Sequence, residues 1–242
     1  QGVSSAASDV YKRQVGYQGH GTLTLGGGKL TGYGRTVVGA RSGGAGEVSV
    51  TSGTWTNFGP VTIGSAGTGR LDIGGTGKVT LLDALTVGSQ GTVSIGRGGT
   101  LQLLWSYTET FDPPSVTWSD PTVTGDIAND GRLYFGRAAA TTYGGVISGS
   151  GSVVKAGDAL LTFSGNHTLS GTYTVSSGEL RVDGSTTAAS RLLVQNAGRL
   201  SGTGTIGGPT TIAGTLSPGH SPGVLAFGDT LEFAAGGGLF WE

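Results

Sequence analysis

Short alternations of apolar and polar residues, broken by glycines, recur along most of the chain. Four of them begin at intervals of 25, 23 and 22 residues: GTLTLGGGKL (21–30), GEVSVTSGTW (46–55), GRLDIGGTGKV (69–79) and GTVSIGRGGTL (91–101). Successive side chains of a strand point to opposite faces of a sheet. Each segment therefore predicts two short strands that meet at a glycine-rich corner.

When the four segments are aligned, residues of one kind fall into columns. The apolar columns are Leu23, Val48, Leu71, Val93; then Leu25, Val50, Ile73, Ile95; and, after the glycine break, Leu30, Trp55, Val79, Leu101. The polar column Thr24, Ser49, Asp72, Ser94 lies between the first two. A repeat of this length is typical of a solenoid, in which stacked coils share one continuous core. We expect the apolar columns to point inward and the polar column to face water.

A second marker has almost the same period: Val15-Gly16, Val38-Gly39, Ile63-Gly64 and Val87-Gly88. Glycine tolerates the backbone angles of tight corners. The prediction is an all-β parallel β-helix (β-solenoid) of about ten coils. The general rule for crossovers between parallel strands gives weak support to a right-handed coil. A β-sandwich is the alternative, but its strands are usually longer and its repeats less alike.

Composition narrows the range of partners. The chain has 50 glycines in 242 residues, a net charge of −1 and no cysteine. It contains no run of Lys or Arg, so the sequence gives no electrostatic reason to expect nucleic acid or an anionic membrane as a partner. No apolar stretch approaches the ~20 residues of a membrane-spanning helix, which argues against direct membrane insertion. Without cysteine, disulfides and thiolate metal sites are excluded.

The first residues differ from everything that follows. The chain has no methionine, and SSAASDVYKRQ (4–14) resembles the translation of a sequencing adapter. We interpret residues 1–14 as a non-native tail that makes few packing contacts, and the remainder as an internal fragment of a longer protein.

The rest divides into three parts: glycine-rich repeats over 15–103, an insertion or transition loop over 104–124, and repeats of a second type over 125–242. The insertion is rich in aromatic residues and proline. Its Trp105, Tyr107, Phe111 and Trp118 have two interpretations that the sequence leaves open. They bind a sugar or a protein partner from a projecting loop, or they pack down on the solenoid.

The second type of repeat carries a family signature. The segment ISGSGSVVKAGDALLTFSGNHTLSGTYTVSSGELRV (147–182) resembles the autotransporter-associated β-strand repeat of bacterial autotransporter passengers. The matching positions are Gly149, Gly151, Val153, Lys155, Gly157, Leu161, Phe163, Gly165, Asn166, Gly171, Val175, Gly178, Leu180 and Val182. Ala159 and Leu169 depart from the pattern. GTLSPGHSPG (214–223) is similar to a segment common near the end of such passengers.

This resemblance implies a right-handed β-helix that is secreted and displayed at the cell surface, on the outer membrane. An export signal would precede the fragment, and an outer-membrane barrel or a sorting anchor would follow it. The implied function is a structural passenger stalk with an adhesive role, and the partners would be host or environmental surface glycans or proteins. The repeat itself is scaffold and implies no activity.

The sequence assigns no catalytic, cofactor-binding or metal-binding residue. A carbohydrate-active β-helix enzyme is one alternative function, and a sugar-binding module that uses residues 104–124 is another. The enzyme would need carboxylates that converge on one face. Asp126 and Asp130 are the nearest pair, with Arg132 close by, but Asn129-Asp130-Gly131 also predicts a simple turn. The three histidines, His20, His167 and His220, lie in glycine-rich corners and are expected to be exposed.

Overall fold

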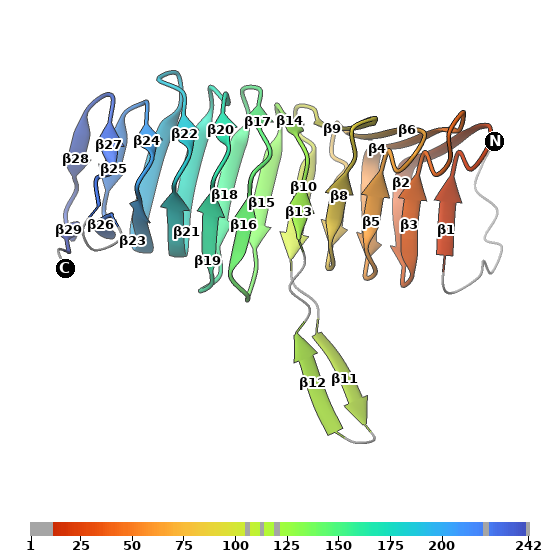
Figure 1. Cartoon of the computed structure of the whole chain (residues 1–242), viewed down its shortest axis with the longest axis horizontal. Coiled ribbons are helices and arrows are strands. Elements are labelled where there is room, and N and C mark those ends of the chain that lie inside the picture. The colour runs from red at the N-terminus through yellow and green to blue at the C-terminus, as the bar shows by residue number, and fades with distance from the viewer. Residues whose placement is uncertain (1–11, 105–106, 112–113, 119–121, 220–222, 241–242) are drawn as a thin grey trace.

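The computed structural model describes residues 12–104, 107–111, 114–118, 122–219 and 223–240 of the chain. These residues form strands, turns and bends without a helix, and parallel strands stack into a β-solenoid of about 9 turns. Figure 1 shows the strands side by side along one long axis, with β1 (Lys12–Val15) and β29 (Gly238–Leu239) at opposite ends. Nothing in the described part of the chain is a helix with the length and apolar character of a membrane span. The all-β solenoid prediction is therefore confirmed, whereas the handedness of the coil stays a prediction.

The solenoid has three walls, and each coil contributes a strand to every wall. Wall A consists of the first parts of β2 (His20–Gly32) and β4 (Ala45–Asn57), followed by β6 (Thr68–Ile73), β9 (Gly91–Ile95), β14 (Ile127–Asn129), β17 (Ile147–Ser148), β20 (Asn166–His167), β22 (Ser185–Thr186), β24 (Thr205–Ile206) and β27 (Ala226–Phe227).

Wall B begins with the second parts of β2 and β4. It continues through β7 (Lys78–Leu81), β10 (Thr100–Leu104), β15 (Arg132–Gly136), β18 (Ser152–Ala156), the first parts of β21 (Thr172–Val182) and β23 (Arg191–Gly202), β25 (Thr210–Ile212) and β28 (Leu231–Phe233).

Wall C closes the cross-section. It consists of β1 (Lys12–Val15), β3 (Arg35–Val38), β5 (Val61–Ile63), β8 (Leu85–Val87), β13 (Val123–Thr124), β16 (Thr141–Tyr143), β19 (Leu160–Phe163), the second parts of β21 and β23, β26 (Thr215–Pro218) and β29 (Gly238–Leu239).

The strand register confirms the predicted columns. Leu71 is paired with Val48 on one side and with Val93 on the other, and Val79 is paired in the same way with Trp55 and Leu101. All six side chains are buried, with exposed fractions of 0–1%. The side chains of the polar column Thr24, Ser49, Asp72, Ser94 are exposed or partly exposed, as predicted. The apolar side chains of successive coils form one continuous core.

Three of the four glycines in the second marker have the predicted role, whereas Gly88 has no positive φ and is limited only by its close approach to Gly64. Gly16, Gly39 and Gly64 occupy the same corner in three successive coils, with φ of 70°, 71° and 70°. This left-handed backbone region is unfavourable for residues with a Cβ atom. In the same corners a Cβ would lie within 2.3 Å of backbone atoms of the next coil. Glycine is therefore required both by the angle and by the close approach.

The insertion interrupts the walls between β10 and β13. Its strands β11 (Tyr107–Phe111) and β12 (Pro114–Trp118) form an antiparallel hairpin. The other strand pairs in the described part of the chain are parallel. Figure 1 shows this hairpin standing away from the body of the solenoid.

The N-terminal boundary needs a correction. Residues 12–14, which the sequence places in a tail with few contacts, form part of β1 and pair in register with residues 35–37 of β3. A strand that caps an open wall gains a full ladder of backbone hydrogen bonds whatever its side chains are, because the ladder uses main-chain groups. Residues 1–11 of the predicted tail lie outside the described residues.

Candidate functional site

The hairpin carries the side chains that the sequence singles out for partner binding. Tyr107 and Trp118 are directly opposite each other in the antiparallel register, and Phe111 is opposite Pro114. The position of Trp105 and the side chains of Tyr107, Phe111 and Trp118 lie outside the described residues. The backbone therefore supports a projecting element, while the role of its aromatic residues stays a prediction.

The carboxylates considered for catalysis bind backbone amides of the neighbouring coil. Asp126 accepts the N–H of Val146 at 2.7 Å, and Asp130 accepts the N–H of Ser150 at 2.8 Å and its hydroxyl at 2.9 Å. These two bonds from Ser150 hold the pKa of Asp130 below its ordinary value.

The same geometry recurs farther along, where Asp183 accepts the N–H of Thr203 at 3.2 Å. In all three cases donor and acceptor are 20 residues apart, which is one coil. These aspartates thus link successive coils at their corners. Among the described residues, no three His, Asp or Glu side chains form a group that could hold a metal ion.

One histidine corrects the sequence analysis. His20 is exposed as predicted and His220 lies outside the described residues, but His167 is 2% exposed. Its Nδ1 accepts the N–H of Ile147 at 3.1 Å, and its ring lies between aromatic rings, with the Phe163 centroid at 4.5 Å. Burial lowers the pKa of His167 to about 4, so the ring is neutral at physiological pH.

A buried lysine lies on wall B. Lys155 occupies an inward position and is 3% exposed. Its Nζ donates to the carbonyl oxygens of Gly157 at 2.6 Å, Ser177 at 2.9 Å and Ala156 at 3.3 Å. Burial lowers its pKa to about 8, against the attraction of Asp158 and Glu179. The ammonium group therefore joins two coils from inside, and its burial leaves it no route to a partner.

The second part of wall C carries a mixed-charge cluster. Glu179 accepts a hydrogen bond from Ser201 and lies within ion-pair distance of Arg181 (3.8 Å) and Arg199 (3.9 Å). Arg199 also donates to Ser217 at 2.7 Å. The cluster holds two arginines against one carboxylate, and it lacks a histidine or a second carboxylate that would serve as an acid–base partner.

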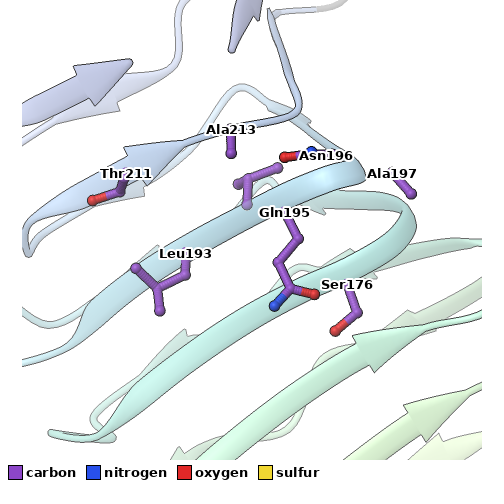
Figure 2. Close-up of a pocket in the computed structure, with 8 residues that line it drawn as sticks. Ser176, Leu193, Gln195, Asn196, Ala197, Thr211 and Ala213 are labelled. Carbon is purple, nitrogen blue, oxygen red and sulfur yellow. The ribbon is translucent and has the colours of Figure 1, made fainter. Parts of the chain in front are cut away.

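A shallow hollow of about 540 Å³ opens where wall B meets wall C in the later coils. The β21–β23 register shifts by one residue there, because β23 holds an extra residue between Val194 and Ala197. Such a bulge bends the strand outward. Figure 2 shows the side chains that line the hollow, and labels Ser176, Leu193, Gln195, Asn196, Ala197, Thr211 and Ala213; Val194 also lines it. The lining is uncharged, with hydroxyl and amide groups beside small apolar ones, and sequence periodicity gave no sign of it.

Two known proteins, an autotransporter adhesin and an extracellular protease, are similar to part of this chain. Over 84 residues, 34% of this chain, it is 43% identical to the adhesin BmaC autotransporter of Brucella suis biovar 1 (strain 1330). Over 80 residues, 33% of the chain, it is 40% identical to an extracellular serine protease of Serratia marcescens. The matches span 2% and 8% of these two proteins, so this chain covers a small part of either.

No family model matches the chain, and no solved structure matches it significantly. The resemblance to autotransporter passenger repeats is nevertheless confirmed, since one relative is an autotransporter adhesin and the fold is a β-solenoid.

Proposed function

We propose that this chain is a segment of a passenger stalk that is displayed on, or released from, a bacterial cell surface, and that its role is structural and adhesive rather than catalytic. The observation that carries the proposal is the stack itself: rung after rung of near-identical strands share one core and hold no assembled acid–base or metal centre among the described residues. Similarity to an adhesin over a third of the chain supports it.

A stalk of this kind needs length and stiffness. Each coil adds about 4.8 Å to the axis, the spacing of neighbouring strands. Inter-coil bonds from Asp126, Asp130, Asp183 and Lys155 tie consecutive rungs at several corners. The projecting hairpin would then present Trp105, Tyr107, Phe111 and Trp118 to glycans or proteins at the side of the stalk, because aromatic faces supply contact area at low entropy cost.

Display is tested with a chimaera. Residues 12–242 replace an equal length of solenoid in an autotransporter, and antibody labelling of intact cells measures surface exposure. The chimaera should label like the parent, whereas the same chimaera with Leu71→Asp should label weakly because the stack is broken. Retention of the unmutated chimaera inside the cell, beside a displayed parent, would count against the stalk.

The adhesive and non-catalytic parts have their own test. The purified chain is screened on glycans and cell surfaces together with Trp105→Ala and Trp118→Ala, which should weaken binding if the hairpin is the contact. If neither change affects binding, the binding surface lies outside the hairpin. If the chain depolymerises a polysaccharide and a change of Asp126 or Asp130 abolishes this activity, the result would favour the carbohydrate-active enzyme over the stalk.

A further inference from the structure

Wall B holds a column of cations that is invisible in the sequence. The register runs Lys29, Thr54, Lys78, Thr100, Arg132, Ser152, Thr172, Arg191, each residue paired with the next. Lys or Arg therefore occupies rungs one, three, five and eight of this column. We call Lys29, Lys78, Arg132 and Arg191 the basic column. Along the chain its members are dozens of residues apart, so no basic run marks them.

The basic column is open to solvent and its charge is not cancelled. Lys29, Arg132 and Arg191 are exposed and Lys78 is partly exposed. None of the four forms an ion pair with a described residue. Of the ten wall B segments, only the last, in β28, includes a carboxylate, at Glu232.

The other two walls differ in this respect. On wall A, Arg70 is paired with Asp72, and on wall C, Arg181 and Arg199 flank Glu179. On those walls Arg70, Arg181 and Arg199 each lie within ion-pair distance of a carboxylate, which none of the basic column does among the described residues. A protein with a net charge of −1 thus carries four unpaired cations in one column, on a wall whose described segments include a single carboxylate. Such an arrangement attracts an extended anion rather than a compact one.

The spacing favours a sparse linear polyanion. Rungs are about 4.8 Å apart, so Lys29, Lys78 and Arg132 follow each other at about 9.6 Å. This interval is close to the length of one disaccharide in an extended chain. A DNA duplex carries one phosphate charge per ~1.7 Å of axis, far more densely than this column. Between the cations the column presents the hydroxyls of Thr54, Thr100, Ser152 and Thr172, which are groups that bind sugar hydroxyls.

The far end of the column runs into the hollow of Figure 2. Arg191 and Leu193, which lines the hollow, are two residues apart on β23 and therefore lie on the same face, with Cα atoms about 7 Å apart. The hollow adds Gln195, Asn196 and Thr211 as uncharged hydrogen-bonding groups. The basic column and the hollow beside its end together give a chain-like ligand one continuous path to follow.

We propose that wall B binds a linear anionic polysaccharide, with its carboxylate or sulfate groups on the basic column and a sugar unit in the hollow. The ligand would lie along the solenoid axis and cross successive rungs. This inference supplies a partner class to the adhesive role proposed above and rests on that role only for its biological setting. Surface display is measured on cells without any polymer, and wall B is tested on purified protein. Either proposal can therefore be refuted while the other stands.

The test measures binding of the purified chain to four immobilised polymers: polygalacturonate, dextran sulfate, neutral dextran and duplex DNA. The test variant combines Lys29→Gln, Lys78→Gln, Arg132→Gln and Arg191→Gln. The control variant combines Arg35→Gln, Arg41→Gln, Arg70→Gln and Arg181→Gln, which removes the same charge from other faces. Thermal unfolding of each variant checks that the solenoid is intact, and the pair Arg132→Gln with Arg191→Gln replaces the test variant if it is not.

The wild type should bind one or both anionic polysaccharides, more weakly as salt rises, and neutral dextran should not bind. The test variant should lose about tenfold or more in affinity, because each lost cation removes a charge contact and its counterion release, while the control variant should retain most of the affinity. The carboxylated and sulfated polymers show which acid group is preferred. Equal losses in both variants, absence of binding to either polysaccharide, or tighter binding to duplex DNA would overturn the proposal.

Discussion

The imidazole ring of His167 lies parallel to the phenol ring of Tyr143, with ring centroids 5.9 Å apart and planes at 8°. Phe163 meets both rings edge-on, and Tyr173 lies beside the imidazole at 6.4 Å. Offset and edge-to-face contacts of this kind are the favoured geometries of aromatic rings. The histidine thus acts as one more aromatic filler of the core, and it brings a titratable group into an apolar interior.

His167 should make the solenoid sensitive to acid. Its pKa is about 4 in the folded chain, below the ordinary value of 6.5, so the unfolded chain binds the proton more readily. Stability is then complete above about pH 6.5 and falls as the pH drops toward 4. The loss should reach up to about 3 kcal/mol, at about 1.4 kcal/mol per pKa unit.

The measurement is urea unfolding at several pH values between 7.5 and 4.5. His167→Asn, which keeps an acceptor for Ile147 N–H but does not titrate, should flatten the slope. His20→Asn, on an exposed site, should leave the slope as in the wild type. A steep acid loss that persists in His167→Asn would show that other groups cause it.

Leu71→Asp should destabilise the solenoid by several kcal/mol. The side chain is fully buried between Val48 and Val93, and a carboxylate there would have no partner. Thr92→Asp is the control, because Thr92 is an exposed position paired with Arg70, and it should stay within about 0.5 kcal/mol of the wild type. Similar free energies of unfolding for the two variants would mean that the column of Leu71 does not point into the core.

Sequence reasoning succeeded where one coil repeats the next. The pairs Leu71–Val93 and Val79–Leu101 were predicted by alignment of glycine breaks, and the ladder joins the same residues. A solenoid converts a fixed period directly into contacts, so periodicity alone gives the register. The extra residue in β23 has no counterpart in the period, and the hollow it creates could not be predicted.

The failures have a common physical cause. His167 was assigned to an exposed corner because its neighbours in the chain are polar and small, but its contacts come from the coils on either side. Likewise Lys29 and Lys78 lie far apart along the chain, but in the stack only Thr54 separates them. Residue type shows what a group can do. Its exposure and its contacts depend on how the coils stack, and the stacking is known only when the register of every coil is known.

Gly171→Ala should be strongly destabilising, whereas Gly26→Ala should be close to neutral. A Cβ at Gly171 would lie 1.7 Å from the carbonyl oxygen of Gly151 in the coil below, which forces backbone atoms apart. A Cβ at Gly26 meets nothing within 4 Å. Thermal unfolding of the two variants compares them. A small effect at Gly171 would show that the coils can separate locally without loss of the ladder.

Lys155→Met should remove a tie between coils. The carbonyls of Gly157 and Ser177 would lose their donor, which costs about 1–3 kcal/mol when the acceptor stays buried. Loss of the buried charge offsets part of this cost, so a net destabilisation near the lower end is expected at pH 7. Lys29→Met, at an exposed position, is the stability control and should leave the free energy of unfolding nearly unchanged.

The pH dependence gives a sharper readout for Lys155. Its folded pKa of about 8 is below the ordinary 10.5, so the unfolded chain holds the proton more tightly. Between pH 8 and 10 the wild type should therefore gain stability relative to Lys155→Met, because the folded chain releases its proton first. The difference between the two free energies of unfolding, followed over this range, isolates Lys155 from the other groups that titrate there. A constant difference would mean that the ammonium group is as well solvated as one at the surface.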